Sequence, residues 1–120
     1  LIDFDFAGPV DPLVELAQAC WLNAKLHDDM VAEREGLPPL AERGKQLRAI
    51  VDAYGLSARQ RKDFVTRMIE FVIHDTVEQA DDAGITPDTT DFEPAWGMAW
   101  RARAAVWMLR HRSTLQNALS

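Results

Sequence analysis

Several kinds of residue are scarce in this 120-residue sequence, and each scarcity argues against a class of protein. The one cysteine, Cys20, cannot form an intramolecular disulfide, which favours a reducing compartment and a cytoplasmic protein. No apolar run approaches the ~20 residues of a membrane span, and no secretory signal leads the chain, so we expect no membrane association. The remaining composition, 48% hydrophobic and 27% charged, is that of a single globular domain.

Basic residues and histidines are also few. Thirteen Lys and Arg face nineteen Asp and Glu, a net charge of −6, so nucleic acid is not an expected partner. The one basic cluster comprises Arg101, Arg103, Arg110 and Arg112. Its position favours a helix C-terminus and a solvated face over phosphate binding. The three histidines are too dispersed for zinc. For His27, with Asp28 and Asp29, a solvated helix end is favoured over a weak cation site.

Hydrophobic spacing and capping residues predict a mainly α fold. About four helices are expected, over residues 11–26, 40–54, 57–82 and 90–115. Gly55 is placed to end the second helix in the left-handed conformation, and Ser57 with Gln60 forms a capping box at the third. Thr90 and Glu93 predict another capping box at the fourth. A short strand end in residues 1–6 precedes these helices, within one domain over residues 1–120.

Two acidic residues near the start of the chain form the first candidate site. Asp3 and Asp5 alternate along the predicted strand end, so both carboxylates face the same side. Such a pair suits Mg²⁺, with Asp3 as the main ligand and Asp5 as the weaker one. The alternative is that both acids only hold a turn or cap a helix.

Side chains on the predicted helices offer further candidates. Cys20 lies on an apolar helix face, where a buried, inert thiol is expected. Trp96, Trp100 and Trp107 form one helical stripe. A stripe of this kind is favoured as core, and the alternative is a cage for a cationic ligand, which makes Trp96 and Trp100 candidate substrate-binding residues.

The opening segment LIDFDFAGPVDPLVELAQACW resembles the segment that follows the catalytic loop in the aminoglycoside phosphotransferase family, relatives of choline and protein kinases. The residues that match the family pattern are Ile2, Asp3, Phe4, Asp5, Ala7, Asp11, Pro12, Leu16 and Ala17. The later stretch WGMAWRARAAVWMLRHR resembles the last helix of some members. The resemblance implies a fragment of a protein-kinase-like fold. It also implies that Asp3 binds Mg²⁺ and that Glu15 braces the catalytic loop.

The family's Gly-rich loop, ATP-binding lysine and H-G-D-x-x-x-x-N catalytic loop do not occur in these 120 residues. The sequence therefore predicts the acceptor-side, C-terminal part of a small-molecule kinase. The parent would use ATP and Mg²⁺ to phosphorylate a hydroxyl of a small acceptor, and the chain alone would be inactive. The alternative hypothesis is a stand-alone helical interaction module without catalysis. Under either hypothesis, the exposed N-terminal strand is expected to cause self-association, or residues 1–10 to be disordered.

Overall fold

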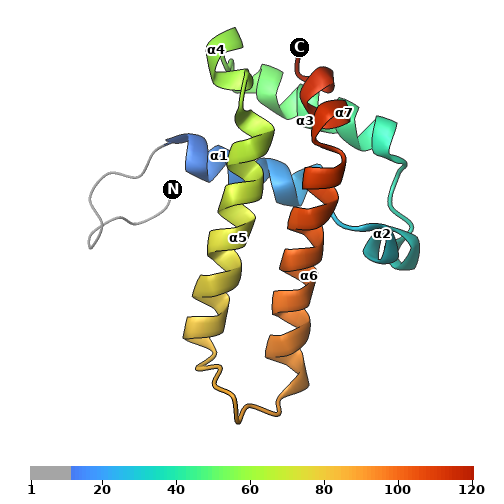
Figure 1. The fold of residues 1–120 in the computed structure, drawn as a ribbon. Helices are drawn as coiled ribbons and strands as arrows, with labels where there is room; N and C mark the ends of the chain where they lie inside the picture. Colours follow the sequence, from blue (N-terminus) through green and yellow to red (C-terminus); the bar gives the residue numbers. More distant parts are fainter. Residues whose placement is uncertain (1–11) are drawn as a thin grey trace.

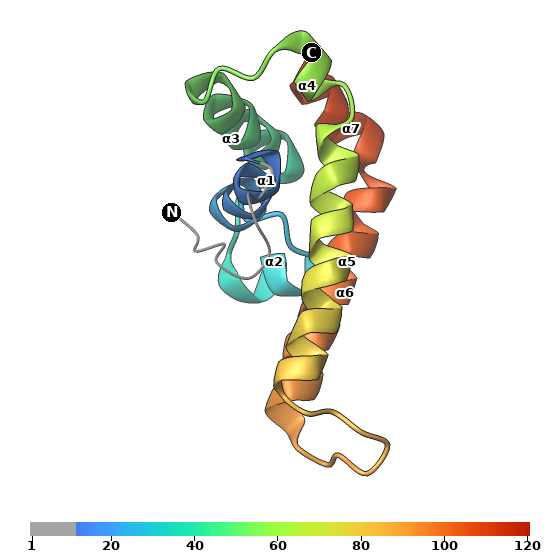
Figure 2. The same cartoon turned by 90° about the vertical axis from the view of Figure 1, so that its left-hand side faces the viewer.

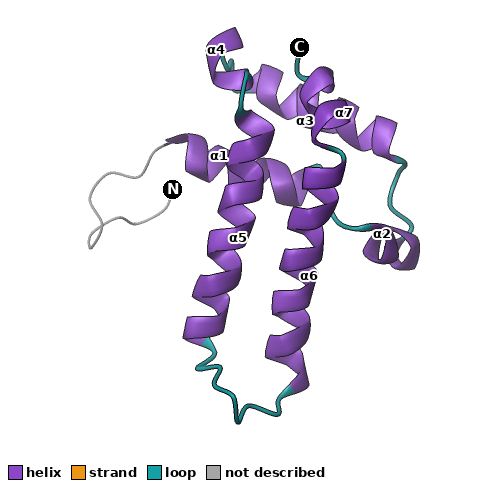
Figure 3. Cartoon of the chain, viewed as in Figure 1, coloured by secondary structure: helices purple, strands orange, loops and turns teal. Residues whose placement is uncertain are grey.

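The computed structural model describes residues 12–120, and this part of the chain folds into seven helices without a strand (Figures 1 and 3). They are α1 (Pro12–Asn23), α2 (Asp29–Glu35), α3 (Leu40–Ala53), α4 (Ala58–Arg61), α5 (Phe64–Asp82), α6 (Phe92–Arg110) and α7 (Arg112–Ala118). The mainly helical prediction is confirmed. The expected strand end in residues 1–6 lies outside the described residues.

A long antiparallel hairpin of α5 and α6 dominates the structure (Figure 1). Viewed from the side, α1, α2 and α3 all lie on one side of this hairpin, and α7 continues beyond the upper end of α6 (Figure 2). α1 packs on α5, and α3 contacts both α1 and α7. None of the helices in residues 12–120 is long and apolar enough to cross a lipid bilayer.

The first predicted helix ends earlier than expected, and a short helix that was not predicted follows it. Lys25 adopts the left-handed conformation (φ 57°), and the amide of Leu26 donates to the Trp21 carbonyl, which together terminate α1. Asp28 then caps α2 by accepting from the amide of Val31 at 3.1 Å. Nothing in the sequence indicated that the first helix ends before residue 26, because Lys25 fills a position that usually carries glycine.

The region around α3 and α4 follows the sequence closely. Gly55 has φ 69°, as predicted for the residue that ends α3. Ser57 and Gln60 form the expected capping box, in which each side chain accepts from the other residue's backbone amide. The capping box predicted for the last helix was wrong. Asp91 is the N-cap of α6, and its side chain accepts no cap hydrogen bond.

Two of the predicted helices are each divided in two. The helix expected over 57–82 breaks after α4, and the side-chain amide of Gln116 lies in the break. Gln116 donates to the Arg61 carbonyl and accepts from the Val65 amide at 3.4 Å. In an unbroken helix those two backbone groups would bond to each other. The last predicted helix is likewise interrupted at His111, between α6 and α7.

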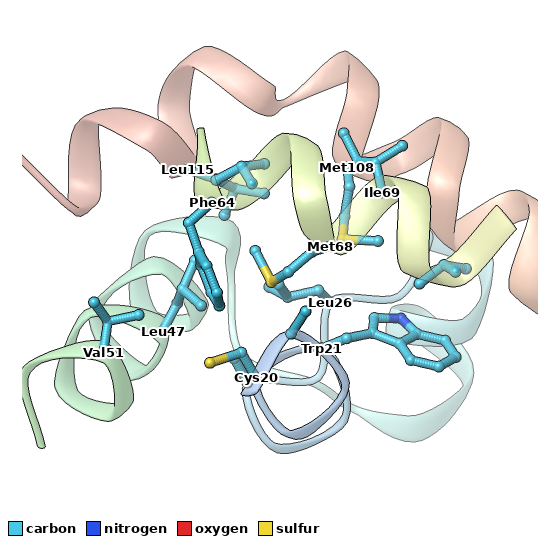
Figure 4. Close-up of a cluster of buried hydrophobic side chains, with 14 of the residues drawn as sticks. Cys20, Trp21, Leu26, Leu47, Val51, Phe64, Met68, Ile69, Met108 and Leu115 are labelled. Atoms are coloured by element: carbon cyan, nitrogen blue, oxygen red, sulfur yellow. The ribbon is translucent and has the colours of Figure 1, made fainter. Parts of the chain in front are cut away.

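One hydrophobic core joins α1, α3, α5, α6 and α7 (Figure 4). Its largest fully buried side chains include Trp21, Leu47, Phe64, Met68 and Met108. Cys20 lies among them, as predicted, with its thiol fully buried. Because these residues come from segments far apart in the sequence, the core fixes how these five helices pack against one another.

Candidate functional site

The sequence-predicted site residues do not come together in the described structure. Asp3 and Asp5 lie outside the described residues. Glu15 is half-buried in the first turn of α1 and lines a surface pocket of about 430 Å³ beside the α3–α4 turn. Neither Trp96 nor Trp100 is among the residues that line it. Within residues 12–120, no three His, Cys, Asp or Glu side chains form a group that could hold a metal ion.

The tryptophan stripe on α6 packs mostly into the structure. Trp100 stacks against Trp21 of α1, with ring centroids 5.2 Å apart, and against His27 at 4.7 Å. Arg101 lies over the outer face of Trp100 at 5.4 Å and pairs with Asp75 at 2.7 Å. The cation nearest to Trp100 is therefore the protein's own guanidinium. Trp96 is 37% exposed, and a role for either residue in ligand binding stays a prediction.

Arg43 forms the centre of a buried polar network behind α2 and α6. Its side chain is only 3% exposed, and Nη1 donates to the carbonyls of Lys25 and His27 at 3.0 and 3.1 Å. The guanidinium also lies 4.5 Å from the ring centroid of Trp107. The two hydrogen bonds hold the α1–α2 loop against α3. They also compensate the buried positive charge, since a buried cation is tolerated only when it is hydrogen-bonded.

This network supports an open pocket between α2 and α6. The indole Nε1 of Trp107 donates to Asp29 at 3.0 Å, and Asp28 pairs with Arg103 at 3.6 Å. The pocket has a volume of about 350 Å³, and we call it the α2–α6 pocket. The larger side chains that line it are those of Asp28, Asp29, Arg103, Val106, Trp107 and Arg110. Its wall thus presents two carboxylates, two guanidinium groups and one indole within a small space.

The environments of Cys20 and His27 do not activate either residue for covalent or acid–base chemistry. Burial raises the pKa of the Cys20 thiol to about 12, so the thiolate needed for nucleophilic attack does not form near neutral pH. Burial likewise lowers the pKa of His27, which keeps the imidazole neutral among its aromatic neighbours. The interpretation of His27 as part of a solvated helix end was wrong, because the α1–α2 loop folds inward over Trp21. The α2–α6 pocket can hold a ligand that carries charges of both signs next to an apolar group.

Sequence reasoning missed this pocket because its parts lie 78 residues apart, as in the bond between Asp29 and Trp107. Two local signals were present. Asp28 stands three residues before Val31, a spacing typical of an N-cap, and Gly36 ends α2 with φ 65°. Together they would have revealed α2, although not its contact with α6.

Comparison with known proteins finds a curated relative that matches the whole chain. It is 54% identical over all 120 residues to a protein from Rhizobium leguminosarum bv. trifolii named Trifolitoxin immunity protein. The chain spans 46% of the length of that protein. No protein-family model matches the sequence, and no solved structure matches it.

This relative overturns the kinase interpretation. The resemblance to aminoglycoside phosphotransferases had a specific motif only within the first 17 residues, whereas the similarity to the immunity protein, 54% identity, extends over all 120 residues. The identification as a phosphotransferase fragment, with the activity that followed from it, was therefore wrong. A short run of acidic and apolar residues at a strand end and helix start is a weak signal, since many folds use such residues for turns and caps. The expected Mg²⁺, ATP and small acceptor came with that resemblance, and nothing in residues 12–120 tests them.

Proposed function

We propose that this chain is a non-catalytic helical module of an immunity protein, which protects its cell by binding a toxin. The observation that carries the proposal is the similarity to a protein named for immunity to trifolitoxin, which is 54% identical over the full 120 residues of the chain. Since the chain spans 46% of that protein, the module would act together with further residues in the complete immunity protein.

The α2–α6 pocket is the surface that we assign to the toxin. Three features support this choice. Asp28 and Arg103 offer charges of both signs, and Trp107 offers an indole edge beside them. Arg43 holds the pocket wall in place from behind, so the wall is pre-organised and loses little conformational entropy when a ligand binds.

The place of action that we propose is the cytoplasm. Cys20 is a buried thiol without a disulfide partner, which fits a reducing compartment. A toxin would then be bound after it enters the cell.

A chimera tests the proposed function. The 120 residues of this chain replace the matching 120 residues of the Rhizobium immunity protein, and the chimera is expressed in a trifolitoxin-sensitive strain. We expect growth in trifolitoxin at concentrations that stop the strain without the chimera. A second chimera carries Leu47→Asp, which places a charge in the core and should abolish protection. A chimera that folds but gives no protection would contradict the proposal.

A further inference from the structure

The charged groups on the wall of the α2–α6 pocket are not equally free to bind a ligand. One carboxylate oxygen of Asp28 accepts from the amide of Val31 at 3.1 Å, and the other lies 3.6 Å from Nη1 of Arg103. The Asp28 side chain is only 15% exposed, so little of its carboxylate is open to a ligand. Asp28 and Arg103 therefore largely neutralise each other within the protein.

The second carboxylate of the wall, that of Asp29, balances a cation behind the pocket. Its Oδ1 accepts from the indole Nε1–H of Trp107 at 3.0 Å. The guanidinium of Arg43 lies 4.5 Å from the centroid of the same indole ring. Burial lowers the pKa of Arg43, and the negative charge of Asp29 opposes this shift, so Asp29 stabilises the buried cation. The charge of Asp29 is thus compensated by Arg43.

Arg110 is different, because within residues 12–120 it has neither an ion pair nor a hydrogen bond from its side chain. It is exposed and lies two helical turns after Arg103, on the same face of α6. The pocket wall and Arg43 behind it carry three guanidinium groups against two carboxylates. The excess positive charge is that of Arg110, whose planar guanidinium can donate two parallel hydrogen bonds to one carboxylate.

Apolar surface lies next to Arg110. Val106 precedes it by one helical turn, lines the pocket and is 54% exposed. Val106 also lines an apolar recess of about 310 Å³ between α5 and α6, together with Val77 and Leu109. Aliphatic surface therefore continues from the pocket past Val106.

We propose that the α2–α6 pocket binds a carboxylate group that stands next to an aliphatic side chain. The carboxylate pairs with Arg110, and the aliphatic group packs on Val106. A cationic ligand is disfavoured because the carboxylates of Asp28 and Asp29 are already engaged. A phosphate group, which carries about two negative charges, would be repelled by these same carboxylates. Under the proposed function, on which this last step rests, the carboxylate belongs to the toxin.

NMR spectroscopy of the chimera with the Rhizobium protein tests the ligand class without the toxin. The indole Nε1–H signal of Trp107, assigned with Trp107→Phe, reports on the pocket. We expect a saturable shift of this signal during a titration with N-acetyl-leucine. N-acetylglycine, which lacks the aliphatic group, should bind more weakly. N-acetyl-leucinamide, in which an amide replaces the carboxylate, and the cation leucinamide should leave the signal nearly unchanged.

The outcomes that would overturn the proposal are distinct. They are the absence of a saturable shift with N-acetyl-leucine, an equal shift with N-acetyl-leucinamide, and a larger shift with leucinamide. If N-acetylglycine binds as tightly as N-acetyl-leucine, Val106 does not contact the ligand and the aliphatic part of the proposal is wrong.

Three substitutions locate the contact. Arg110→Gln should weaken the binding of N-acetyl-leucine at least about tenfold, and Arg110→Lys, which keeps the charge but not the paired hydrogen bonds, about threefold. Asp29→Asn removes a negative charge but keeps an oxygen that can accept from Trp107, so it should strengthen binding about threefold. Arg59→Gln, at an exposed site on α4, is the control and should have no effect. Unchanged binding by Arg110→Gln, or weaker binding by Asp29→Asn, would refute the proposed contact.

The toxin separates this inference from the proposed function. When the carboxylates of trifolitoxin are converted to methylamides, binding by the unaltered chimera should fall at least about tenfold, and Arg110→Gln should cause no further loss. If the converted toxin binds as tightly as the original, the group that the pocket recognises is not a toxin carboxylate. If N-acetyl-leucine binds at Arg110 but the chimera does not bind the toxin, the proposed function fails while the ligand class of the pocket is supported.

Discussion

Gln116 joins the two parts of a divided helix, and removing its amide should destabilise the fold. The side chain substitutes for one backbone hydrogen bond, since it donates to the Arg61 carbonyl and accepts from the Val65 amide. Gln116→Met keeps the length of the side chain and removes both bonds. A hydrogen bond contributes about 0.5–1.5 kcal/mol net, and the 3.4 Å bond to Val65 falls at the weak end, so we expect a loss of about 1–2 kcal/mol.

Urea and thermal unfolding, followed by tryptophan fluorescence, measure this loss. It should lower the melting temperature by roughly 4–8 °C in a domain of this size. Gln46→Met is the matched control, because Gln46 is exposed on α3, and it should change the stability by less than about 0.5 kcal/mol. An equal and small effect of both substitutions would refute the reasoning. It would mean that the Val65 amide bonds directly to the Arg61 carbonyl once the glutamine is gone, so that α4 and α5 merge at no cost.

Three further predictions follow from buried or strained residues. Burial lowers the pKa of His27 below its ordinary value of 6.5, so below that pH the unfolded chain binds a proton that the folded chain does not. As the pH is lowered below 6.5, the stability measured by urea unfolding should therefore fall by up to about 1.4 kcal/mol per pH unit, until the pKa of the folded chain is reached. His27→Gln should flatten this slope, and an unchanged slope in the variant would contradict the prediction. Lys25→Gly should raise the stability by about 0.5–1 kcal/mol, as glycine relieves the strain of φ 57°, and a destabilised variant in the same assay would disprove this. Cys20 should react with a thiol reagent only as fast as the chain unfolds, and rapid labelling in native buffer would show that the thiol is not buried.

The sequence predicted those parts of the fold that are determined by near neighbours. The end of α3 at Gly55 and the capping box of Ser57 and Gln60 depend on residues within one turn, and both were correct. The division of the next helix was not predictable, because Gln116 enters the break from 55 residues away. The early end of α1 was hidden because Lys25, rather than glycine, takes the left-handed conformation.

In the candidate site, too, local features were predictable from the sequence and tertiary contacts were not. The helical character of the α6 tryptophans and the burial of Cys20 were apparent from spacing. The α2–α6 pocket was not, because it depends on tertiary contacts such as that of Arg43 with Trp107. Function was the least accessible part. A motif confined to the first 17 residues pointed to a kinase, and only the identity along the whole chain corrected it.

Direct binding of trifolitoxin to the purified chimera, in which this chain replaces the matching 120 residues of the Rhizobium immunity protein, is the measurement that tests the central claim most directly. Isothermal titration calorimetry should detect saturable binding. Arg103→Glu, which reverses a charge in the α2–α6 pocket, should weaken it at least about tenfold. Arg59→Glu makes the same change at an exposed site on α4, away from the pocket, and should bind like the unaltered chimera. Absence of binding by the folded chimera, or equal binding by the unaltered chimera and both variants, would contradict the account.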